Sequence, residues 1–142
     1  MIDLPSNEQP WHVLLGRICP YCGEATTYCD SAVIYGRSYG MIYRCEPCQA
    51  WVGVHKKHPK NALGRLANRE LRKWKQAAHA HFDPLWKMSI RKHARINAYC
   101  WLGQQMGLEE ARTHIGMFNV EQCKNVVKLC RKLLGKNASL VK

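Results

Sequence analysis

The sequence lacks a long hydrophobic run. Val13, Leu14 and Leu15 are its only apolar run near the N-terminus, and most of residues 1–10 are polar. A signal peptide or a membrane-spanning helix needs a much longer apolar segment. Walker loops, GxSxG motifs and convincing pairs of catalytic carboxylates are also missing. The lack of a long apolar run favours a cytoplasmic protein that does not enter membranes. The lack of catalytic motifs gives no support for an enzyme.

Acidic residues are scarce, and their scarcity is uneven. The 142 residues hold 10 Asp and Glu against 22 Lys and Arg, a formal net charge of +12. Residues 1–58 are balanced, whereas residues 59–142 carry 17 Lys and Arg against five acids. We therefore expect two domains, a neutral one over 1–58 and a basic helical one over 59–142.

Cysteine, in contrast, is abundant and regularly placed. CPYC at 19–22 and CEPC at 45–48 are two CxxC pairs separated by 22 residues. Two such pairs can complete a tetrahedral all-sulfur shell around one zinc ion. The predicted ligands are Cys19, Cys22, Cys45 and Cys48.

The segment between the pairs is rich in β-branched and aromatic residues. Residues 26–28, 32–35 and 41–44 are expected to form strands, with a turn at 36–40. The sequence therefore predicts an α+β protein, with an N-terminal zinc ribbon of β-hairpins followed by a small three-helix part. Four thiolates leave no open coordination position, so we expect a structural zinc in a reducing compartment.

Three helices are expected in the second part. Asn68 caps the first, which runs from Arg69 towards Phe82, before Asp83-Pro84 interrupts it. Ser89 is a candidate cap for the second, and Gly107 is suited to end it. Asn119 and Gln122 have the spacing of a capping box for the third.

Basic residues on, or shortly before, two of these helices are candidate phosphate contacts. An exposed helix face usually mixes Glu with Lys, whereas here like charges follow one another at i,i+4. The candidates for nucleic-acid binding are Arg65, Arg69, Arg72, Lys73, Lys124, Lys128, Arg131 and Lys132. A face that is merely solvated, or one that meets an acidic protein, remains an alternative.

Several motifs together resemble a known family. They are CPYCG (19–23), YRCEPCQAWVGVH (43–55), LGRLAN (63–68), AHAHFDPLWK (78–87) and HIGMFNVEQC (114–123). The chain resembles a family of small zinc-finger-containing proteins of unassigned function found in bacteriophages and prophage-bearing bacteria. The resemblance implies zinc bound by the four cysteines and no established activity. It also implies a phage or prophage origin and a location in the bacterial cytoplasm.

Other residues suggest chemistry less strongly. His79, His81 and Asp83 resemble an HxHxD metal-hydrolase motif, but positions i and i+2 of a helix point apart. Cys100, Cys123 and Cys130 are expected on apolar helix faces, as small hydrophobes; with His114 they could form a second zinc site. His114 itself is expected to have a structural role.

Three functions remain open from the sequence. The first is a nucleic-acid-binding protein whose basic helices bind phosphate and whose zinc ribbon is a scaffold. The second is a phage-encoded adaptor or inhibitor that binds a host protein. The third is a metal-dependent nuclease, which we do not expect because the zinc would be saturated by sulfur.

Overall fold

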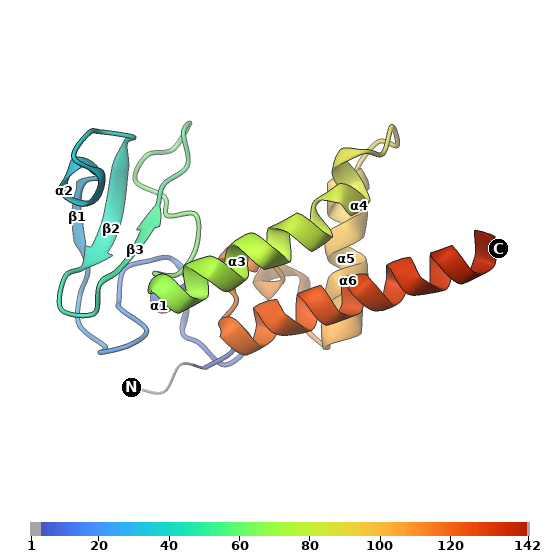
Figure 1. Ribbon diagram of the computed structural model, residues 1–142. Helices are drawn as coiled ribbons and strands as arrows, with labels where there is room; N and C mark the ends of the chain where they lie inside the picture. The colour runs from blue at the N-terminus through green and yellow to red at the C-terminus, as the bar shows by residue number, and fades with distance from the viewer. Residues whose placement is uncertain (1–3, 142) are drawn as a thin grey trace. The chain divides into compact units, whose positions relative to one another are not determined.

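The computed structural model describes residues 4–141, with side chains as far as residue 135. Figure 1 shows its helices and strands. The chain divides into two compact units, Met1–Arg72 and Lys73–Lys142. The division falls within one helix, α3 (Arg69–Phe82). Whether residues 1–58 and 59–142 are separate folding domains stays a prediction.

The first unit is built on a small antiparallel sheet. The three strands pair in the order β1-β2-β3. The elements of this unit that precede α3 are α1 (Trp11–Leu14), β1 (Thr27–Asp30), α2 (Ala32–Tyr35), β2 (Met41–Cys45) and β3 (Ala50–Gly53). The prediction of a mixed helix-and-sheet fold with a sheet near the N-terminus is thereby confirmed.

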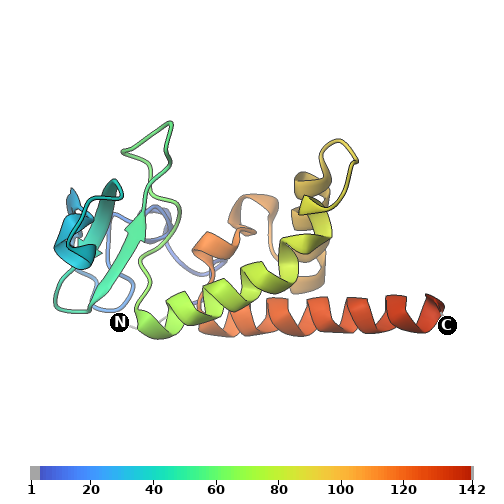
Figure 2. The same cartoon turned by 45° about the horizontal axis from the view of Figure 1, so that its top comes forward.

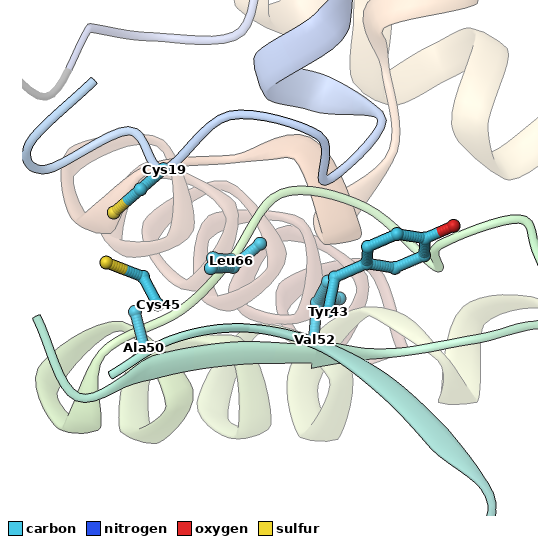
Figure 3. Packing of buried hydrophobic residues seen from close by; sticks show 6 residues of the cluster. All are labelled: Cys19, Tyr43, Cys45, Ala50, Val52 and Leu66. Atoms are coloured by element: carbon cyan, nitrogen blue, oxygen red, sulfur yellow. The ribbon is translucent and has the colours of Figure 1, made fainter. Parts of the chain in front are cut away.

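One face of this sheet forms the core of the first unit. Tyr43 and Cys45 of β2 are buried beside Ala50 and Val52 of β3, as the alternation of side chains along a strand requires. Leu66, from a later segment, is fully buried in the same cluster. Figure 3 shows Leu66 between the sheet and the segment that carries Cys19.

The expectation of a strand at residues 32–35 is wrong. These residues form the short helix α2, which ends at Gly36 with φ of 76°. Side chains hold the connection in this form: Asp30 Oδ1 accepts the Ala32 N–H at 2.8 Å, and Ser31 Oγ accepts the Tyr39 N–H at 2.8 Å. Such local bonds compete with strand pairing, and they override the β propensity of Val33 and Ile34.

The loop after β3 belongs to the first unit. Isolated bridges join Val54 to Ala62 and Trp51 to Ala67. The hydroxyls of Tyr28 and Tyr43 donate to the carbonyls of Pro59 and Lys60 at 2.7 and 2.6 Å. Residues 59–68, which the charge pattern assigned to the helical part, therefore pack with the sheet.

The second unit is helical and holds more helices than expected. Three were expected; instead, Asp83-Pro84 starts a separate helical turn, and the segment before the last helix forms two 3-10 turns. The elements are α3 (Arg69–Phe82, from Lys73 onward), α4 (Pro84–Lys87), α5 (Ala94–Met106), η1 (Glu110–Arg112), η2 (Ile115–Met117) and α6 (Val120–Val141).

Three helix ends follow the predicted chemistry. Asn68 Oδ1 accepts the Leu71 N–H at 3.0 Å, and Gly107 ends α5 with φ of 68°. Asn119 Oδ1 accepts the Gln122 N–H at 2.9 Å, and Gln122 Oε1 accepts the Asn119 N–H at 3.2 Å, which is a reciprocal capping box. Ser89 is not a cap, because α5 begins five residues later at Ala94.

Packing within the second unit joins α6 and α5 to the part of α3 that belongs to this unit. The two helices α3 and α6 run side by side in both views (Figures 1 and 2). Lys124 Nζ of α6 lies 5.2 Å from the ring centre of Trp74 on α3, and the rings of Phe82 and Tyr99 are 4.6 Å apart. None of the helices in the described residues combines the length and hydrophobicity that a bilayer crossing needs.

Candidate metal centre and basic residues

The first cysteine pair lies on a tight turn before the sheet. The Cys19 N–H donates to the Glu24 carbonyl at 2.8 Å, and the Gly23 N–H donates to the Cys19 carbonyl at 2.9 Å. Gly23 has φ of 81°, which an L side chain rarely adopts. The turn therefore places both sulfurs on the same side of the backbone loop.

The second pair lies where β2 turns into β3. Cys45 is the last residue of β2, and Cys48 falls in the turn that follows. Gln49 has φ of 53° and donates its N–H to the Glu46 carbonyl at 3.1 Å. Gln49 thus occupies the position that Gly23 occupies in the first pair. The sequence did not signal this, because glutamine is not a residue typical of that conformation.

The four sulfurs meet at one point. The Sγ atoms of Cys19, Cys22, Cys45 and Cys48 all lie within 4.8 Å of one another. The Sγ atoms of Cys22 and Cys45 are 3.7 Å apart, close to the edge of about 3.8 Å expected for a tetrahedron with Zn–S bonds of about 2.3 Å. Figure 3 shows the sulfurs of Cys19 and Cys45 pointing toward each other. The prediction that these residues can hold one zinc ion is confirmed.

Electrostatics favour a cation at this point. Burial raises the pKa of Cys19, and burial together with the neighbouring thiols raises the pKa of Cys48. The pKa of Cys22 is lowered, chiefly by a hydrogen bond from the Glu24 backbone N–H. Thiolates crowded together repel one another, so a divalent cation is needed to hold all four deprotonated.

The donor set determines what the metal can do. Four sulfur ligands fill a tetrahedral zinc shell and leave no position for water or substrate. Zinc bound there would cross-link the two turns. It would not act as a Lewis acid, because no coordination position is open. Cys19 and Cys45 also belong to the buried core cluster, so two residues of the candidate metal site form part of the core.

Comparison with known families agrees with this geometry. A family model described as a zinc-finger-containing domain matches residues 16–133, which include all four cysteines. The chain belongs to this family. No curated protein and no solved structure matches it.

The other cysteines of this zinc-finger-containing protein are dispersed. Cys123 and Cys130 are buried, whereas Cys100 is exposed, against expectation. Burial raises the pKa of Cys130 to about 11, so its thiol stays protonated at neutral pH. Within the described residues, the one group of metal-ligating side chains that converges is the set of four described above.

The predicted phosphate contacts on α3 and before it are placed differently from one another. Arg69 and Lys73 are exposed, one turn apart on α3. Arg72 is half-buried, with its guanidinium 3.6 Å from the ring centre of Trp51 and 2.7 Å from the Ala67 carbonyl oxygen. Arg65 is fully buried, and its Nε donates to the Leu66 carbonyl. Arg65 therefore has no access to a phosphate.

The predicted contacts on α6 share one face. Lys124, Lys128, Arg131 and Lys132 are all exposed, and Cys123, Val126, Val127 and Cys130 are buried on the other side. Lys124 Nζ lies 3.7 Å from a carboxylate oxygen of Glu121. Among the residues that the structure describes, the other three have no ion pair.

The histidines do not converge. His79 Nδ1 lies 3.1 Å from Asp83 Oδ2, but His81 Nδ1 donates to the Ala77 carbonyl at 2.8 Å. His114 lines a cavity of about 400 Å³ in the second unit with Arg95 and Tyr99. Burial and the nearby Arg95 lower its pKa.

Proposed function

We propose that this zinc-finger-containing protein binds nucleic acid through the basic face of α6. The face is defined as Lys124, Lys128, Arg131 and Lys132. On an α-helix these four positions fall within an arc of about 100° and a length of about 12 Å. A duplex carries one phosphate per about 3.4 Å of each strand, so several cations of the face are in reach of one backbone.

The single observation that carries the proposal is the combination of exposure and unbalanced charge on this face. Like charges at i,i+4 destabilise a helix by a few tenths of a kcal/mol. Within the part of the chain that the structure describes, Lys124 is the one residue of this face with an ion pair, to Glu121. A partner rich in phosphate would supply the missing counter-charge.

We further infer that the first unit is a zinc ribbon that acts as the scaffold. Two CxxC turns joined by an antiparallel sheet support this assignment. The phage or prophage origin and the cytoplasmic location are predictions from the sequence resemblance and from the reducing conditions that free thiols need.

The test is the salt dependence of binding to a duplex oligonucleotide. Lys124→Glu with Lys128→Glu should lower the affinity at least about tenfold at low salt and reduce the log-log salt slope, since each phosphate contact contributes about −0.9. Arg91→Glu with Lys92→Glu is the matched control, because it changes the charge equally at exposed positions of the second unit. Equal losses in both variants would refute a specific role for α6.

A protein-binding adaptor is the second candidate. Met88 and Ile90, between α4 and α5, are 85 and 103% exposed. Exposed apolar residues in one segment are a feature of protein-binding surfaces. Binding of a host protein that persists after nuclease treatment, with no affinity for nucleic acid, would favour this candidate.

A nuclease is the remaining alternative. The four-sulfur shell leaves no site for water activation, and His79 and His81 bond to different partners. We therefore expect no cleavage of DNA or RNA with Mg²⁺, Mn²⁺ or Zn²⁺. Cleavage that both His79→Ala and His81→Ala abolish, with the fold intact, would contradict this expectation.

A further inference from the structure

Three aromatic side chains gather on the first unit, outside its core. The rings of Tyr35 and Tyr39 are 5.6 Å apart, and those of Tyr35 and Trp51 are 6.4 Å apart, both edge to face. The indole N–H of Trp51 donates to the hydroxyl of Tyr35 at 3.3 Å. We call Tyr35, Tyr39 and Trp51 the aromatic face.

The aromatic face is not part of the hydrophobic core. Trp51 lies between Ala50 and Val52 of β3, whose side chains point into the core, so it points to the opposite side of the sheet. Tyr35 is 54% and Tyr39 68% exposed. Burial in the core therefore does not account for these rings.

Arginines surround the same rings. The guanidinium of Arg37 lies 5.2 Å from the ring centre of Tyr39, and that of Arg72 lies 3.6 Å from the ring centre of Trp51. Arg44 of β2 is the cross-strand partner of Trp51, which places it on the same side of the sheet. The acidic residue closest to α2 along the chain is Asp30. It accepts hydrogen bonds from the Ala32 N–H and the Ser38 hydroxyl.

Aromatic rings interleaved with arginines have a known use in recognition. Unpaired bases stack on aromatic side chains, and arginine contributes both cation–π contacts and phosphate contacts along the strand. Stacking of this kind requires a base whose face is free, which paired bases inside a duplex do not offer. The short α2 and its turn also present no long helix to enter a major groove.

We propose that the aromatic face binds single-stranded nucleic acid, with bases stacked on Tyr35 and Tyr39 and with the phosphates held by Arg37 and Arg44. The inference shares its ligand class with the proposed function, but it gives the zinc unit a direct contact instead of a scaffold role only. It also predicts tighter binding to single strands than to duplexes. Phosphate contacts from α6 alone would not produce this preference, since they do not distinguish stacked from free bases.

The test compares two labelled ligands by fluorescence anisotropy: a 12-nucleotide oligothymidylate and a hairpin duplex with a short closed loop. Tyr35→Ala with Tyr39→Ala should lower the affinity for the oligothymidylate by about 5- to 150-fold for each base that loses its stacking. Its affinity for the duplex should change less than threefold. Zinc content and circular dichroism verify that the variant is folded.

The matched variant is Tyr35→Phe with Tyr39→Phe, which keeps the rings and removes only the hydroxyls. Its affinity for the oligothymidylate should stay within about threefold of the wild type, since stacking uses the ring. If the alanine variant binds the oligothymidylate as the wild type does, the inference is wrong. An equal loss in the phenylalanine variant would also overturn it.

A third variant separates this inference from the proposed function. If Lys124→Glu with Lys128→Glu weakens binding to both ligands and the alanine variant weakens neither, α6 is the contact and the aromatic face is not. If the alanine variant loses the oligothymidylate and the α6 variant loses nothing, the inference holds and the proposed role of α6 fails. If the wild type binds neither the oligothymidylate nor the duplex, both the inference about the aromatic face and the proposed role of α6 are wrong.

Discussion

Gly23 and Gln49 follow the two cysteine pairs and adopt the same left-handed backbone conformation. Their φ angles are 81° and 53°. Glycine reaches this region without strain, whereas a residue with a side chain does so at a cost of about 1–2 kcal/mol. The second turn therefore forms despite an unfavourable residue, and we attribute this to its place between two paired strands.

Substitutions at these two residues should change the free energy of unfolding by unequal amounts. Gly23→Ala should lower the free energy of unfolding by about 1 kcal/mol or more, because it adds a Cβ at positive φ. Gln49→Gly should change it by less than about 1 kcal/mol, since relief of strain is offset by a more flexible unfolded chain. Urea denaturation in excess zinc measures both. Equal losses at the two positions would contradict this account.

At the scale of elements, the start of α6 depends on side chains that replace missing backbone partners. Asn119 and Gln122 bond reciprocally and are both buried. The first N–H groups of a helix have no acceptor within the helix itself. A side chain that accepts one of these N–H groups therefore contributes more to stability here than it would in the middle of the helix.

Asn119→Ala should destabilise the second unit by about 1 kcal/mol, within the range of about 0.5–2 found for such caps. Asn125→Ala is the matched control: it makes the same change at an exposed position inside α6. It should leave stability unchanged or slightly raised, because alanine is the better helix former. Thermal unfolding followed by circular dichroism distinguishes the two. A greater loss in the control would disprove the capping role.

Glycine within a helix offers a second test at this scale. A Cβ added at Gly103 of α5 would lie 2.9 Å from Thr113 Oγ1, whereas one added at Gly135 of α6 would meet nothing within 4 Å. Thr113 has little freedom to move, because its hydroxyl donates to the Glu109 carbonyl at 2.7 Å. Gly103 therefore permits the close approach of α5 and the segment after η1.

Gly135→Ala should raise stability by up to about 1 kcal/mol, the usual gain in an exposed helix. Gly103→Ala should lower the melting temperature in spite of the same gain in helix propensity, because the new methyl group clashes with Thr113. Differential scanning calorimetry of the two variants gives the comparison. A stabilised Gly103→Ala protein would show that α5 and this segment separate easily.

At the scale of the whole molecule, the metal and the core of the first unit are linked. Cys19 and Cys45 belong to the four cysteines that can hold one zinc ion, and they are also members of the buried cluster. A unit of about 70 residues with so small a sheet has little apolar surface to bury. Zinc binding and folding of this unit are therefore expected to share one free energy.

Elemental analysis should find one zinc per chain, and Cys22→Ser should lose it and unfold residues 17–54. Cys100→Ser is the control, since Cys100 is exposed and lies outside the cluster. In the zinc-loaded protein, iodoacetamide should modify Cys100 before the four ligands, and a chelator should expose those four. A metal-free wild type with a cooperatively folded sheet would overturn the linkage.

Features determined by neighbouring residues could be predicted from the sequence alone. The CxxC spacing predicted the four cysteines whose sulfurs converge, because a tight turn places both sulfurs together whatever surrounds it. The Asn119–Gln122 capping box and the Gly107 helix end were predicted for the same reason. Each depends on atoms within a few positions along the chain.

Features that depend on distant contacts were decided by the tertiary structure. Arg65 looked like a surface cation, but it is buried, and its ring contact with Tyr21 is 44 positions away along the chain. Residues 32–35 have strand propensity, yet Asp30 and Ser31 bond to the backbone and hold a helical turn there. The exposure of Tyr35 beside Trp51 follows from that turn and from strand pairing, which bring separate segments to one side of the sheet. Such contacts cannot be predicted from the composition of a local segment. The sequence therefore predicted the metal site, whereas the fold determined which arginines and aromatic rings reach the surface.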